Sequence, residues 1–126
     1  GFYWNYNDET REFSKRFKER HGTMPTMIQA GIYSATTHYL KAIEATGTDD
    51  SVTVRKWMGE NAINDFFAKD GKIREDGRMM HTMYLAKVRA PGDTDDADDV
   101  SEVIREIPAE EAFMPLSKST CSLVKK

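Results

Sequence analysis

The residues most able to do chemistry are three histidines and one cysteine, and their spacing indicates no reactive centre. His21, His38 and His81 fall on three different predicted elements, and none has a second ligand type at metal-binding spacing. Cys121 is the single cysteine, so it can close no disulfide within the chain and build no thiolate cluster. The sequence also contains no nucleophile elbow and no glycine-rich phosphate loop. We therefore predict no catalytic residue, no metal site and no cofactor.

The acidic run from Asp93 to Asp99 holds five aspartates in seven residues and follows Pro91-Gly92. An EF-hand calcium loop needs a central glycine and a closing glutamate, and this run has neither. A solvated loop is the expectation.

The composition of the 126 residues suits a globular domain, with 39% hydrophobic and 31% charged residues. No apolar run approaches the roughly 20 residues that a membrane-spanning helix needs. The net charge of −3, with basic residues scattered among acids, argues against nucleic acid as a partner. Three aromatic residues directly after Gly1 do not form a signal peptide, and we expect further natural sequence to precede them.

Three helices are predicted in the first half of the chain. One covers about 8–21, with Asn7-Asp8 at its start and Gly22 at its end. A second covers about 25–46, with Pro25 in its first turn, and its many apolar residues predict the most buried element. A third, short helix starts near 49–51 and stops at Gly59. Small residues around Gly31 let another segment approach the second helix closely.

Extended structure is predicted in the second half. Asp76-Gly77 favours a hairpin turn, followed by one long strand over 79–88. The apolar spacing within 100–107 fits either a helix or a strand. Tyr33, near the start of the second helix, combines an apolar ring with a phenol, and its position alone favours a core role.

The strings themselves show a resemblance in order along nearly the whole chain. They are Phe2-Tyr3-Trp4, Asn7 to Phe13, Pro25 with Gln29 to Ala35, Ile63 to Phe67, Gly71 to Arg78, Tyr84-Leu85, Ile107-Pro108, Glu111 to Leu116 and Cys121 to Lys126. This series resembles the later part of type I periplasmic binding proteins, the branched-chain amino acid receptor family of ABC importers. The chain departs from the pattern in its acidic run and at Ser122, where proline is common.

The resemblance implies an α/β fold, the C-terminal part of a two-lobe binding protein, with about three helices, a β-hairpin and a crossing strand over 100–107. Residues 1–90 would form lobe helices and hairpin, and 91–126 would form the acidic loop, the crossing strand and the tail. Tyr33 would face the ligand cleft, with Trp4 and Tyr6 as further candidates near a crossing. Gly31 is expected to serve packing.

The function that the resemblance implies is capture of a small solute, an amino acid or a related aromatic or aliphatic carboxylate, and its delivery to an ABC permease. The location would be the periplasm, and the protein would not be an enzyme. A cytoplasmic ligand sensor on the same fold and a stand-alone interaction domain remain as alternatives. Because this piece lacks the sheet that its helices would cover, we expect it to self-associate when it is alone.

Overall fold

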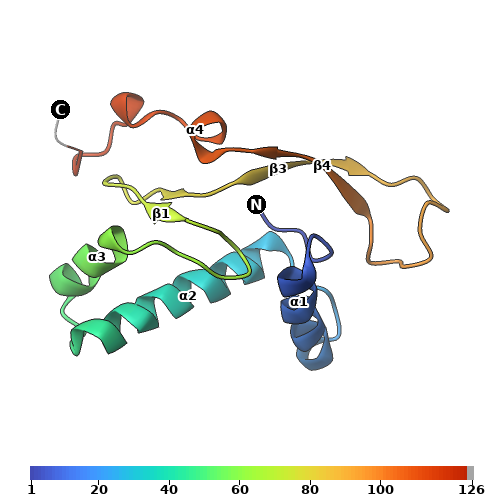
Figure 1. Ribbon diagram of the computed structural model, residues 1–126, viewed down its shortest axis with the longest axis horizontal. Coiled ribbons are helices and arrows are strands. Elements are labelled where there is room, and N and C mark those ends of the chain that lie inside the picture. The colour runs from blue at the N-terminus through green and yellow to red at the C-terminus, as the bar shows by residue number, and fades with distance from the viewer. Residues whose placement is uncertain (125–126) are drawn as a thin grey trace.

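The computed structural model describes residues 1–124; the three longest helices lie in the first half of the chain, and the strands follow them, with two short helical turns after the last strand (Figure 1). The elements are α1 (Asp8–His21), α2 (Met27–Thr46), α3 (Ser51–Glu60), β1 (Lys72–Ile73), β2 (Met79–Met80), β3 (Met83–Val88), β4 (Ser101–Ile107), α4 (Ala109–Ala112) and the 3-10 helix η1 (Leu116–Lys118). The end of the resembling string, Lys125-Lys126, lies outside the described residues. None of the helices in the described part is long and apolar enough to cross a membrane.

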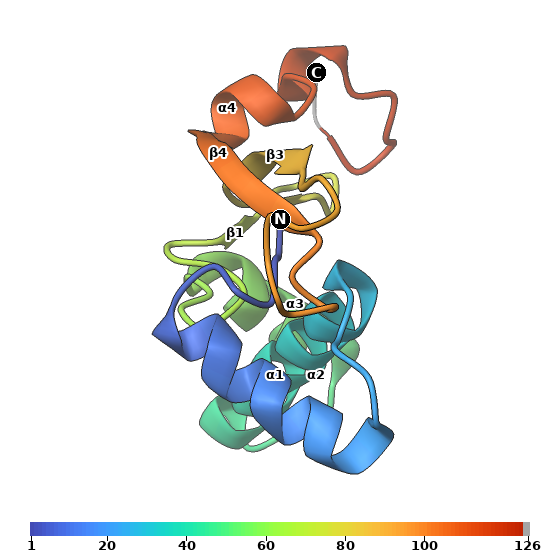
Figure 2. The same ribbon diagram turned by 90° about the vertical axis from the view of Figure 1, so that its right-hand side faces the viewer.

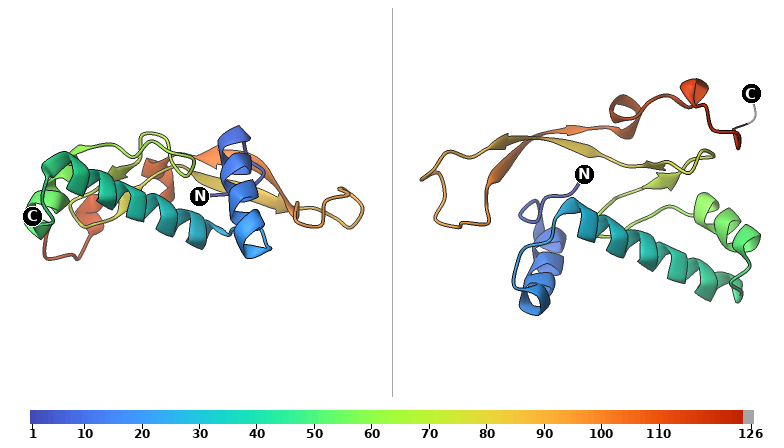
Figure 3. Two further views of the ribbon diagram at one scale, coloured as in Figure 1. Left: turned by 90° about the horizontal axis from the view of Figure 1, so that it is seen from below. Right: turned by 180° about the vertical axis from the view of Figure 1, so that it is seen from behind.

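The elements form two layers. Helices α1, α2 and α3 lie on one side, and the paired strands β3 and β4 lie on the other together with α4, as Figure 2 shows from the side. Helix α1 crosses α2 near the start of α2 (Figure 3). The chain therefore places its N-terminal segment between a helical layer and a strand layer.

Helix α1 has the limits that the sequence predicts, because both of its ends are fixed by local chemistry. The side chain of Asn7 accepts a hydrogen bond from the Thr10 amide at 2.9 Å, and the Thr10 hydroxyl accepts one from the Asn7 amide at 2.9 Å. Gly22 ends the helix in the left-handed conformation at φ 81°. This reciprocal cap and the glycine satisfy backbone groups that a helix end leaves unpaired.

Helix α2 also exists as predicted, but Pro25 precedes it and Thr26 is its cap. The prediction that its broad apolar face is buried is wrong. The buried stripe is made of small or polar residues, Ala30, Ser34, His38 and Ala42. Most large apolar side chains of α2 are exposed; these are Met27, Ile28, Ile32, Tyr33, Tyr39 and Leu40.

The stripe of small or polar residues on α2 is buried because it allows α3 and the segment after α3 to pack closely against the helix. The His38 ring lies against Trp57 of α3 with ring centroids 5.4 Å apart, and its Nε2 is 3.1 Å from the Met58 carbonyl oxygen. Ser34 is 1% exposed and donates to Asp65 at 2.6 Å. Helix α3 begins within the predicted stretch 49–51, with Asp50 as its cap, but it continues past Gly59 to Glu60.

The predicted hairpin at Asp76-Gly77 exists, whereas the long second strand is split in two. Strand β2 pairs with β1 for two residues only, and β3 pairs with β4 in antiparallel register. Just before β1, Gly71 pairs with Ile63 in an isolated antiparallel bridge. The two residues exchange backbone hydrogen bonds of 2.7 and 2.9 Å. The strand prediction for 100–107 is confirmed by β4.

The turn between β1 and β2 is fixed by an ion pair. The Arg74 guanidinium donates to both carboxylate oxygens of Asp76, at 2.9 and 2.7 Å, and holds the pKa of that carboxyl well below its usual range. Arg74 also donates to the carbonyl oxygen of Met114 at 2.9 Å. The pair thereby connects the hairpin to the C-terminal segment.

The acidic run is a loop as predicted, but its end is anchored and not solvated. Asp99 is 8% exposed and accepts a 2.7 Å hydrogen bond from the Tyr3 hydroxyl. The indole of Trp4 donates to the Asp98 carbonyl oxygen at 2.8 Å, and Lys18 donates to the Asp98 carboxylate at 2.6 Å. Residues near the start of the chain thus hold the loop that precedes β4 against α1.

Candidate functional site

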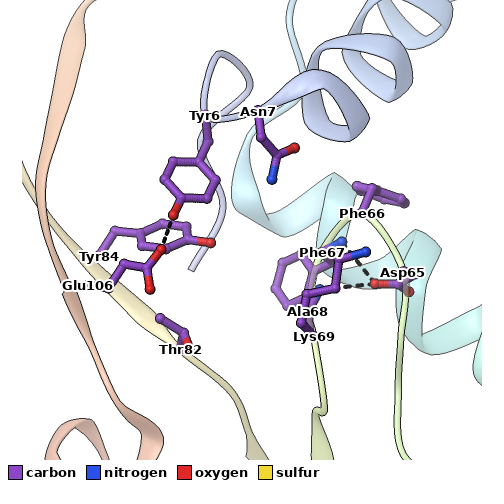
Figure 4. Close-up of a pocket in the computed structure, with 10 residues that line it drawn as sticks. All are labelled: Tyr6, Asn7, Asp65, Phe66, Phe67, Ala68, Lys69, Thr82, Tyr84 and Glu106. Carbon is purple, nitrogen blue, oxygen red and sulfur yellow. Dashed lines mark hydrogen bonds between the residues drawn. The ribbon is translucent and has the colours of Figure 1, made fainter.

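A cavity of about 230 Å³ lies between the helical layer and the strand layer (Figure 4). Its walls come from the segment before α1, the segment between α3 and β1, and the paired strands β3 and β4. The lining residues are Tyr6, Asn7, Asp65, Phe66, Phe67, Ala68, Lys69, Thr82, Tyr84 and Glu106. We call this cavity the interlayer pocket.

The strand side of the interlayer pocket is aromatic and acidic. The rings of Tyr6 and Tyr84 lie against each other with centroids 4.5 Å apart. Glu106 is the cross-strand partner of Tyr84 and accepts a hydrogen bond from the Tyr6 hydroxyl. This hydrogen bond, with some burial, raises the pKa of Tyr6 to about 12. Burial and the nearby Glu106 charge raise the pKa of Tyr84 as well.

The helical side is built on Asp65, which shapes the segment that follows it. Its carboxylate accepts from the amides of Phe67 and Ala68 at 2.8 and 3.0 Å and from the Ser34 hydroxyl at 2.6 Å. These bonds form a tight Asx-type turn and attach it to α2. The turn carries the rings of Phe66 and Phe67. The Phe66 ring stacks on the buried Phe13 of α1, with ring centroids 3.9 Å apart.

Lys69 stands at the rim of the interlayer pocket, where Glu9 of α1 holds it. Its ammonium nitrogen is 2.6 and 2.9 Å from the two carboxylate oxygens of Glu9. The ammonium group of Lys69 is therefore engaged in a solvent-exposed ion pair with a residue of the chain itself.

The groups that remain available in the pocket suit binding. They are the hydroxyls of Thr82 and Tyr84, the carboxylate of Glu106 and several ring faces. No nucleophile is placed beside a general base among these lining residues. Within residues 1–124, no three histidine, cysteine, aspartate or glutamate side chains gather as metal ligands would. Cavities that combine apolar walls with a few polar groups are typical of small-molecule sites.

Of the three predicted ligand-binding residues, the structure places only Tyr6 in the interlayer pocket. Tyr33 is 51% exposed and lies edge-on to Phe13 at 5.1 Å, facing a separate hollow of about 240 Å³ between α1 and α2. The indole nitrogen of Trp4 is engaged by Asp98, and its ring lines a third hollow beside α1.

Sequence reasoning missed Tyr84 and Glu106. Tyr84 belongs to one of the quoted strings, yet nothing assigned it to a site. Glu106 becomes its neighbour only through the pairing of β3 with β4 across the acidic loop, and this register is not readable from the sequence.

The geometry of a small-molecule pocket agrees with the sequence comparison. The periplasmic binding protein family matches residues 1–108. The chain belongs to this family. This family match confirms the resemblance that the sequence showed. It also confirms the prediction that the chain belongs to a family of binding proteins and not of enzymes.

Solved structures of family members match the fold of the chain closely. A periplasmic binding protein from Burkholderia mallei is 39% identical with a TM-score of 0.94 over 98% of the chain. A branched-chain amino acid ABC transporter periplasmic ligand-binding protein from Burkholderia xenovorans LB400 is 41% identical with a TM-score of 0.92 over 97% of the chain. An amino acid ABC transporter substrate-binding protein from Pseudomonas fluorescens Pf-5 is 25% identical with a TM-score of 0.80 over 96% of the chain.

The periplasmic binding proteins that match are much longer than this chain. It covers 33%, 33% and 32% of the three structures. No curated protein matches the sequence. The α/β class is confirmed, and the chain corresponds to part of a periplasmic binding protein.

Proposed function

We propose that the chain is part of an extracytoplasmic solute-binding protein that captures an amino acid or a related carboxylate and delivers it to an ABC permease. The observation that carries this proposal is the 41% identity, over 97% of the chain, to a branched-chain amino acid ABC transporter periplasmic ligand-binding protein. A second relative is an amino acid ABC transporter substrate-binding protein.

The interlayer pocket gives this proposal a mechanism. Its two walls belong to different layers, so a hinge movement between the layers would change its width. Closure would bring the rings of Tyr6 and Tyr84 toward Phe67 and enclose the apolar part of a solute. Hydroxyl groups on the walls would then replace water around its polar part.

The position of the chain within the whole protein is also part of the proposal. We propose that it is the C-terminal portion of a two-lobe fold, with 1–90 supplying lobe helices and hairpin and 91–126 supplying the acidic loop, the crossing strand and the tail. The division falls in the loop between the paired strands β3 and β4. It therefore separates stretches of sequence and not independently folded units.

For the site, we propose that Tyr6 contacts the solute through the interlayer pocket. Tyr33 and Trp4 stay candidates for contacts made with parts of the cleft that this chain does not supply. The periplasm is the proposed location, because the matching family is periplasmic. A cytoplasmic sensor and a stand-alone interaction domain are the competing functions.

A thermal-shift screen of free amino acids and their deaminated carboxylates on the full-length protein tests the function. A solute at a hundred times its dissociation constant stabilises the folded state by about 2.7 kcal/mol, which raises the melting temperature by several degrees. Tyr6→Ala should reduce that rise, and Tyr39→Ala, an exposed tyrosine of α2, is the control. A protein that melts at the same temperature with every solute would favour the stand-alone domain.

A further inference from the structure

The charged groups that line the interlayer pocket differ in how far their polar atoms are occupied by partners within the chain. Lys69 is paired with Glu9 at 2.6 Å. The carboxylate of Asp65 accepts three hydrogen bonds from its own turn and from α2. Glu106 has no ion-pair partner within the described residues, and its one hydrogen bond comes from a neutral phenol. Among the lining residues that the structure describes, both carboxylates therefore lack an ion-pair partner, and Glu106 is the one whose oxygens are least occupied by hydrogen bonds.

The surroundings of Glu106 suit a cation. The Tyr6 hydroxyl engages only one of its two carboxylate oxygens, which orients the group and leaves the other oxygen free to accept (Figure 4). The Tyr6 and Tyr84 rings beside it carry negative electrostatic potential on their faces, which attracts ammonium groups. A carboxylate placed here would instead be repelled by Glu106, and Lys69, the one cation among the described lining residues, is already paired with Glu9.

We infer that Glu106 is the specificity residue that holds an ammonium group of the solute, with the tyrosine pair forming the adjacent wall. This inference rests on the proposed solute-binding function and deepens it. It assigns the solute of this protein to compounds that carry a primary amine. The geometry also implies that any carboxylate of the same solute is recognised outside the interlayer pocket.

The expected size of the effect follows from the kind of contact. A hydrogen bond between charged groups contributes enough that its loss weakens binding between about tenfold and a hundredfold. Glu106→Gln removes the charge and keeps the shape and a hydrogen-bonding group for Tyr6. It should weaken binding of an amine-bearing solute by this factor and leave its deaminated analogue unaffected.

The test is calorimetric titration of the full-length protein with two matched probe pairs. The pairs are leucine with 4-methylpentanoate and phenylalanine with 3-phenylpropanoate. Glu102→Gln is the matched control, because Glu102 lies on the same strand opposite Lys87 and outside the pocket. Ultraviolet titration of the tyrosines provides a structural readout, since loss of the Glu106 charge should lower the pKa of Tyr6 from about 12 toward 10.

The outcomes separate the inference from the function on which it rests. Selective weakening of the amine-bearing probes by Glu106→Gln, with Glu102→Gln unchanged, supports it. Equal weakening of both members of a pair, no weakening, or wild-type preference for a deaminated acid overturns the inference and leaves a solute-binding function standing. Absence of binding by all four probes overturns the inference as well, and the broader solute screen then decides the function.

Discussion

Replacing Asp65 is the perturbation whose consequence the structure defines best. This carboxylate joins the turn that forms the helical wall of the interlayer pocket to the middle of α2. Asp65→Ala removes three acceptor contacts at once. Asp65→Asn keeps an oxygen for the amides of Phe67 and Ala68, and its amide nitrogen can donate to the Ser34 hydroxyl.

The magnitude follows from which donors lose their partner. Ser34 is 1% exposed and Ala68 7%, so in Asp65→Ala a buried hydroxyl and a buried amide are left unpaired, each at a cost of about 1–3 kcal/mol. The amide of the half-buried Phe67 can regain water at smaller cost. We expect Asp65→Ala to lower the free energy of unfolding by about 3 kcal/mol. Asp65→Asn should lose about 1 kcal/mol, since only the charge contribution disappears.

Urea unfolding followed by far-UV circular dichroism measures these differences, with Asp95→Ala, an exposed aspartate of the acidic run, as control. The double mutant Asp65→Ala with Ser34→Ala should lose less than the sum of the two single losses, by about 1 kcal/mol, because both substitutions remove the same contact. Equal midpoints for Asp65→Ala and Asp95→Ala, or strictly additive losses, would show that the Asp65 carboxylate does not anchor the turn to α2.

Three further predictions test other parts of the fold. The Arg74 guanidinium depresses the pKa of Asp76, so the ionised carboxylate stabilises the folded protein above about pH 4, and this contribution is lost progressively as the pH falls below that value. Asp76→Asn should therefore lower the urea midpoint at pH 7 and differ less from wild type at pH 3. Gly31→Ala should stabilise by about 0.5–1 kcal/mol, because the added methyl group would lie 3.6 Å from the nearest ring in ordinary contact, and a lower midpoint would show that this space is not available. The isolated chain should self-associate through the exposed face of α2, and light scattering should detect a shift toward monomer in Ile32→Glu with Leu40→Glu, whereas a wild-type monomer at high concentration would contradict this.

The parts of the fold that the sequence predicts are those fixed by local chemistry. Asn7 with Thr10, and Gly22 and Gly47, set helix limits through contacts within a few residues. The Asp-Gly turn of the β1–β2 hairpin is equally local. Each of these depends on backbone preferences that the sequence carries directly.

The parts that the sequence did not predict depend on partners distant along the chain. The apolar periodicity of α2 pointed to its large side chains, yet Ala30 and Ser34 are buried, because small side chains allow α3 and the Asp65 turn to approach. The anchoring of Asp98 and Asp99 by aromatic residues near the chain start spans more than 90 positions. The candidate site shares this limit, since Glu106 contacts Tyr6 across 100 positions of the chain and becomes the neighbour of Tyr84 only through the pairing of β3 with β4.

We propose that this chain forms part of a protein that binds a small amino-acid-type solute at the interlayer pocket. Isothermal titration calorimetry of the full-length protein, with the solute selected by the thermal-shift screen, is the decisive measurement. We predict one saturable site per protein, with binding weakened by about 1 to 3 kcal/mol in Tyr6→Ala while the free variant stays folded. Unchanged affinity in Tyr6→Ala, or no saturable heat with any amino acid or related carboxylate, would contradict the claim.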